Sequence, residues 1–214
     1  MTFKVTSVAS LRSVARIVAP FAFYLVVVTL GILSMGFQLL GSRLLGPHFG
    51  SGIDVWAWLI STFLAAFSAG SMSGGWISHL PDERRGRVLW TVAGIAVATL
   101  AFTATLGLVT LDRLETARAG LFLSCLTLFF VPVTALSCFG PQYVHFLAAR
   151  GMPPGKASGV AYGVSTLGNI GGVMLTAFVL LPNFRVSTLL YVWLVVASVG
   201  LTLLLKMIRA PSAP

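Results

Sequence analysis

Residues 20–40 read PFAFYLVVVTLGILSMGFQLL and include no charged side chain. A helix rises 1.5 Å per residue, so about 20 apolar residues are enough to cross a hydrocarbon core about 30 Å thick. A segment inside lipid must satisfy its own backbone hydrogen bonds, and a helix does this internally. We therefore expect a membrane-spanning helix here, with Pro20 in its first turn, where a missing N–H costs nothing.

Similar apolar runs recur along the whole chain. Only 9% of its 214 residues are charged, whereas a soluble domain has about 25%, and the mean hydropathy is +0.96. The runs lie at about 20–42, 56–78, 88–110, 120–139, 159–181 and 187–206. The sequence thus predicts an all-α fold, a polytopic membrane bundle of about six transmembrane helices. Pro132 is expected to kink the fourth of them.

The predicted organisation is a single membrane domain, residues 20–206, between two short tails, 1–19 and 207–214. Apolar residues recur at helical spacing in the first tail, so it either lies flat on the membrane surface as an interfacial helix or is frayed. Six spans use roughly 120 residues. No room is expected for a soluble catalytic domain of ordinary size, roughly 100–150 residues.

The basic residues divide unevenly between the two sides of such a bundle. Four lie on one side, at Arg43, Arg113, Arg118 and Arg185. Ten lie on the other, at Lys4, Arg12, Arg16, Arg84, Arg85, Arg87, Arg150, Lys156, Lys206 and Arg209. Lys and Arg accumulate in cytoplasmic loops, so we expect a multi-pass protein of a bacterial inner membrane with both termini cytoplasmic. This explains the net charge of +9 without a nucleic-acid partner.

Glycines are spaced four residues apart at three places. They are Gly70 and Gly74, then Gly155, Gly159 and Gly163, and finally Gly168 and Gly172. Small residues at this spacing let helix backbones approach closely in lipid. We interpret them as helix-packing positions, and the alternative is a flexible, gating helix.

Polar residues form stripes along three of the expected helices. The fifth span carries Ser158, Tyr162, Ser165, Asn169 and Thr176 at helical spacing, the first carries Ser34 and Gln38, and the second carries Ser61 and Ser68. Polar stripes in membrane helices face the bundle interior or a water-filled cavity. The stripes therefore either line a common polar cavity or only join helices by hydrogen bonds.

Charged residues cluster in two of the expected connections. Arg43 and Asp54 flank the first outer loop, where they either form a charge pair or act separately, Arg43 reaching the interface and Asp54 capping a helix. A cytoplasmic charged loop holds Asp82, Glu83, Arg84, Arg85 and Arg87. The three histidines are scattered and the two cysteines form no CxxC motif, so we expect no metal and no cofactor. Motifs of nucleotide, zinc-protease or serine-hydrolase sites are missing, and we expect no enzyme activity in this chain.

Residues 74–87, GGWISHLPDERRGR, resemble the loop between helices two and three of major facilitator transporters. In that family the loop ties helix ends together through charge pairs. The resemblance implies that six spans form half of such a transporter. The acidic residue is displaced here and a proline intrudes.

A wider resemblance covers roughly residues 30–190. Residues 38–51 read QLLGSRLLGPHFGS, residues 55–56 VW, and residues 159–172 GVAYGVSTLGNIGG, followed by LLP at 180–182. These stretches resemble the membrane region of bacterial spermidine-synthase-like proteins, which are fused to a major-facilitator-like part. Gln38 stands where that family usually has an acidic residue, so a cation or proton site there is not carried over. The family's aminopropyltransferase domain is not expected in this chain either, because no glycine-rich nucleoside-binding fingerprint or acidic catalytic pair is present.

Three functions remain open from the sequence. The first is a non-catalytic accessory subunit or anchor that binds a membrane-protein partner. The second is a transporter of a polar metabolite or polyamine, acting as a homodimer of six-span halves, although a polycation path should offer carboxylates. The third is the membrane half of a split spermidine-synthase-like enzyme. In all three the lipid bilayer surrounds the chain.

Overall fold

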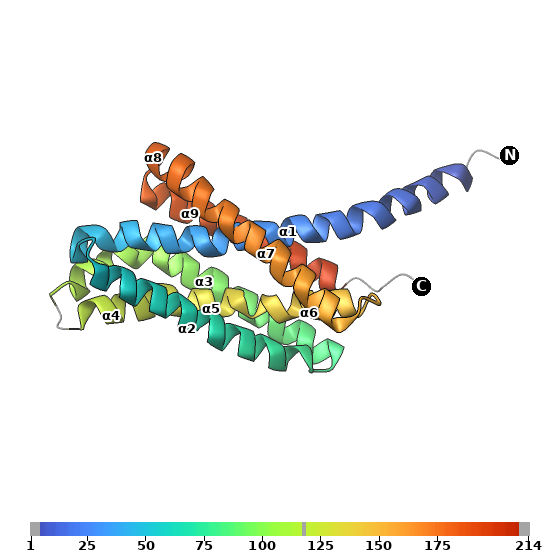
Figure 1. The fold of residues 1–214 in the computed structure, drawn as a ribbon, viewed down its shortest axis with the longest axis horizontal. Coiled ribbons are helices and arrows are strands. Elements are labelled where there is room, and N and C mark those ends of the chain that lie inside the picture. The colour runs from blue at the N-terminus through green and yellow to red at the C-terminus, as the bar shows by residue number, and fades with distance from the viewer. Residues whose placement is uncertain (1–4, 117–118, 210–214) are drawn as a thin grey trace.

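The computed structural model describes residues 5–116 and 119–209, with side chains described from residue 21 to residue 208 within those ranges. The described residues form helices and no strand (Figure 1). Six segments are long and apolar enough to cross a membrane: 21–49, 53–78, 82–114, 120–148, 154–183 and 186–208. The predicted all-α, six-helix membrane fold is confirmed. Each segment is longer than its predicted apolar run, because the helices continue through the polar residues at the run ends.

The first three spans are single helices, α1 (Val5–Phe49), α2 (Ile53–Ser78) and α3 (Asp82–Leu114). The prediction that Pro20 lies in a first helical turn is wrong, because α1 begins at Val5 and runs past Pro20 without a break. The first tail is therefore helical from Val5 onwards and continuous with the first span. Met1–Lys4 and the C-terminal residues 210–214 lie outside the described part of the chain.

The fourth and fifth spans each contain a π-helical turn. The fourth consists of α4 (Gly120–Cys125), η1 (Leu126–Phe130), α5 (Val131–Ser137) and α6 (Phe139–Ala148). The fifth consists of α7 (Pro154–Leu175), η2 (Thr176–Leu180) and α8 (Leu181–Asn183), and the sixth is α9 (Val186–Arg209). Each π turn comes just before a proline, which has no N–H to donate to the preceding turn.

The spans pack as one bundle. The helix α1 packs chiefly on α7 and also on α9, α2 and α3 pack on the fourth span, and α3 also packs on α9. Figure 1 shows α7 and α9 crossing α1 on one side of the molecule, with α2 to α6 on the other. The rings of Phe37, Phe63 and Phe129 join α1, α2 and η1 in the core, with centroids 5.5–6.1 Å apart.

The start of α1 and the end of α9 lie at one end of the bundle, together with the α2–α3 and α6–α7 connections (Figure 1). We call this the terminal end, and the opposite one, which holds the α1–α2 connection, the loop end. An even number of spans requires this arrangement. Which end faces the cytoplasm stays a prediction from the charges.

Candidate functional site: a polar pocket between α2 and α7

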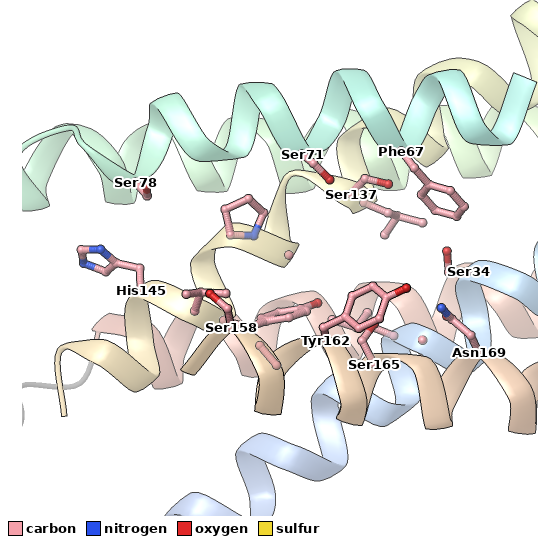
Figure 2. A pocket seen from close by; sticks show the side chains of 18 of the residues that line it. Ser34, Phe67, Ser71, Ser78, Ser137, His145, Ser158, Tyr162, Ser165 and Asn169 are labelled. Carbon is pink, nitrogen blue, oxygen red and sulfur yellow. The ribbon is translucent and has the colours of Figure 1, made fainter. Parts of the chain in front are cut away.

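A pocket of about 800 Å³ opens between α2 and α7. Its walls come from α1, α2, α5, α6 and α7 (Figure 2). More than half of its lining side chains with polar groups are hydroxyls. The polar lining residues are Ser34, Ser71, Ser78, Ser137, Tyr143, His145, Ser158, Tyr162, Ser165 and Asn169.

The predicted stripe on α7 lies along this pocket. Ser158, Tyr162, Ser165 and Asn169 follow one another along the wall at helical spacing, and Ser34 of α1 lies beside Asn169 (Figure 2). The neighbouring side of α7 packs on α1, because Gly168 lies against the backbone of Val28. Four residues of the predicted stripe therefore line one wall of the pocket.

The other predicted stripe residues lie elsewhere. Ser61 and Ser68 of α2 are exposed outside the pocket, and α2 contributes Ser71 and Ser78 instead. Gln38 is half-buried outside the pocket, and Thr176 is fully buried next to Gly36. Seven-residue spacing links Ser61 to Ser68 and Ser71 to Ser78 alike, so spacing alone could not tell which pair faces inward.

Most polar side chains that line the pocket make no hydrogen bond to another described residue. Ser78 donates to the carbonyl of Gly75 at 2.6 Å and Ser137 to that of Val133 at 2.7 Å. Ser34, Ser165 and Asn169 have no side-chain hydrogen bond to another described residue. These side chains are therefore able to donate and accept hydrogen bonds with a molecule in the pocket.

The terminal end of the pocket carries a basic pair. Nη1 of Arg85 lies 2.6 Å from Nε2 of His145, which lines the pocket, and Nη2 lies 2.8 Å from Oδ1 of Asp82. Arg85 is 13% exposed, whereas Asp82 is 89% exposed. No acidic residue is among the described residues that line the pocket, so its walls offer no carboxylate to a cation.

The residues of the predicted charged loop are helical. Asp82, Glu83, Arg84, Arg85 and Arg87 all lie in the first turns of α3, which begins at Asp82. Acidic residues at a helix N-terminus are favourable next to the unpaired N–H groups. Of this group, Arg85 alone is turned inward enough to reach α6, through His145.

The predicted charge pair between Arg43 and Asp54 is not formed. Both side chains are exposed, and no ion pair joins them in the described parts of the chain. At this loop end Nδ1 of His48 lies 2.9 Å from Glu115 and 3.6 Å from Asp112. The sequence missed this contact because its partners are 67 residues apart.

The glycine positions behave in two ways. Gly70 and Gly74 lie against the carbonyls of Thr134 and Cys138, and Gly168 and Gly172 against those of Val28 and Ile32, where a Cβ would overlap the oxygen. At these four positions the lack of a side chain lets two helix backbones approach closely, which is the packing role predicted for them. Gly155, Gly159 and Gly163 have open space at their Cβ positions, so they pack against no helix of the described chain.

No protein-family model, curated protein or solved structure matches this chain. The resemblance to the membrane region of spermidine-synthase-like proteins and to half of a major facilitator transporter stays a prediction. Function must therefore be argued from the fold and the pocket alone.

Proposed function

We propose that this chain is a membrane transport protein in which two copies meet across α2 and α7, each contributing a pocket that binds a small polar solute. The observation that carries the proposal is the pocket of about 800 Å³ on an open face of the spans, with Ser34, Ser165 and Asn169 unpaired among the described residues. Its size suits a small-molecule site, which typically measures about 300–1,000 Å³.

The position of these polar groups argues against contact with lipid. Ser71, Ser158 and Tyr162 are exposed on the α2–α7 face of this copy. A polar group without a hydrogen-bond partner costs roughly 2–7 kcal/mol in an apolar medium, so membrane helices turn such groups toward protein or water. The α2–α7 face is therefore suited to enclosing a wet cavity rather than to facing acyl chains.

A second molecule of this chain is the simplest partner that could bury the α2–α7 face. Symmetric dimers use the same patch on both subunits, and a face that is polar on one copy meets an equally polar face on the other. Tyr162 is 77% exposed beside the pocket, which makes it the large side chain best placed to reach across.

The mass of the purified protein in mild detergent tests the dimer. We expect a protein mass twice the 22.7 kDa of one chain. Tyr162→Ala should weaken the dimer by about tenfold or more, because truncating a central aromatic anchor costs about 2 kcal/mol.

A matched control is available on the same helical segment. Phe178 is 73% exposed but does not line the pocket, so Phe178→Ala should leave the dimer intact. A purely monomeric protein, or an equal effect of both substitutions, would contradict the arrangement across α2 and α7.

A second candidate is the accessory subunit or anchor, and the open glycine face of α7 favours it. Nine residues, about two and a half helical turns, separate Gly163 from Gly172, so the two glycines lie on opposite sides of α7. One side packs on α1 and the other is bare backbone to which a partner helix can pack closely. A companion protein that co-purifies in constant ratio, and is lost with Gly163→Leu, would select this function. An aminopropyltransferase-like companion would instead favour the split enzyme.

A further inference from the structure

We call the part of the pocket that His145 and Ser158 line, at the terminal end, its mouth. The donor and the acceptor of the hydrogen bond at this mouth can be assigned. An arginine guanidinium only donates hydrogen bonds, so Nε2 of His145, 2.6 Å from Arg85, must accept. We therefore assign the proton of the neutral ring to Nδ1. This N–H belongs to a pocket-lining residue and has no partner among the described residues.

The fixed charges around the mouth are mostly positive. Arg85 stands behind His145 and is largely buried, at 13% exposed. Lys156 lies two residues before Ser158 at the start of α7. The carboxylate nearest to the pair, Asp82, is 89% exposed, so water screens it far more than it screens Arg85.

We propose that this mouth binds the anionic group of the solute, with the Nδ1–H of His145 as donor and Arg85 as the supporting positive charge. This inference rests on the proposed solute pocket and names the ligand class, a small polar organic oxyanion. Its charged group lies near His145 and Ser158, and its hydroxyl or amide groups reach the neighbouring side chain of Tyr162 along the α7 wall (Figure 2). A polyamine is disfavoured because the described lining has no carboxylate.

Thiol labelling tests the charge preference without knowledge of the solute. In a Cys125→Ala, Cys138→Ala background, Ser158→Cys is a reporter at the mouth, and Ser51→Cys is an exposed control at the loop end. Two methanethiosulfonates of similar size are compared, the anionic ethylsulfonate and the cationic ethyltrimethylammonium. In phosphatidylcholine nanodiscs, the anion-to-cation rate ratio should be about tenfold higher at Ser158→Cys than at Ser51→Cys, as one partly buried charge would produce.

Variants then assign the preference to the basic pair. Arg85→Gln should remove most of the preference, and Arg85→Lys should retain it. Arg84→Gln removes an equal charge from an exposed neighbour and should change the ratio less than about twofold. Two additions separate the possible sources of the anion. Slower labelling with phosphatidylglycerol in the disc indicates a lipid headgroup, and slower labelling with succinate in the buffer indicates a free solute.

The possible failures are distinguishable. If Ser158→Cys reacts with neither reagent while Ser51→Cys reacts, the pocket is closed to water and the proposed function falls. If Ser158→Cys reacts without preference for the anion, or the preference survives Arg85→Gln, the solute pocket stands and this inference is overturned.

Discussion

At the residue scale, the bundle depends on side chains that bond to backbone carbonyls of other helices. Trp193 of α9 donates to Leu33 of α1 at 2.9 Å, and Gln142 of α6 donates to Gly74 of α2 at 2.8 Å. Thr103 of α3 donates to Leu128 at 2.9 Å. This last carbonyl has lost its usual helical donor, because the residue four positions later is Pro132. The kink-prone proline is thus accommodated by one buried hydroxyl from a neighbouring helix.

Thr103→Val tests this contact. The substitution keeps the shape of the side chain and removes the hydroxyl that donates to the Leu128 carbonyl, so we expect a loss of about 1 kcal/mol in unfolding free energy. Thr105→Val is the matched control, because Thr105 is exposed and bonds only within α3, to Ala101. Unfolding in mixed detergent micelles measures both, and equal stability of the two variants would contradict the role given to Thr103.

At the scale of elements, α7 is fixed to the bundle through one face only. Gly168 and Gly172 bring it into backbone contact with α1, while Gly155, Gly159 and Gly163 remain open. The pocket wall lies between these two faces. The position of the polar stripe relative to α2 therefore depends on how closely α7 approaches α1.

Substituting one glycine on each face separates their roles. Gly172→Ala places a Cβ on the carbonyl of Ile32 and should destabilise the fold by about 1–3 kcal/mol, the usual cost of overpacking. Gly163→Ala should leave the stability of the single copy unchanged or slightly raised, because Ala is the better helix former. Thermal unfolding in detergent compares the two, and tolerance of Gly172→Ala would show that the α1–α7 contact is looser than described.

The sequence predicted the helices and one pocket wall because both are periodic and local. The stripe from Ser158 to Asn169 follows the turns of a single helix, so the spacing within that one segment is enough to predict it. The choice of Ser71 over Ser68, and the contact between His48 and Glu115, depend on how helices rotate against each other. That rotation is set by tertiary packing, which seven-residue spacing does not encode.

At the scale of the whole molecule, the six spans pack as one bundle with a pocket between α2 and α7. The polar pocket therefore lies on an outer face of the spans. Exposing the polar side chains of such a face to lipid would cost free energy. We propose one account of that face: a second copy encloses it, a polar solute occupies its pocket, and the basic mouth binds the anionic group of the solute.

The central claim is that this face meets water rather than acyl chains, and spin-label accessibility measures it directly. Labels at Asn169→Cys, in the pocket, and at Leu167→Cys, 68% exposed outside it, are compared in bilayers with a polar nickel chelate and with oxygen. Collisions with the nickel chelate should dominate at position 169 and collisions with oxygen at position 167. Oxygen-dominated relaxation at both positions would place the polar stripe of α7 in lipid and contradict the account.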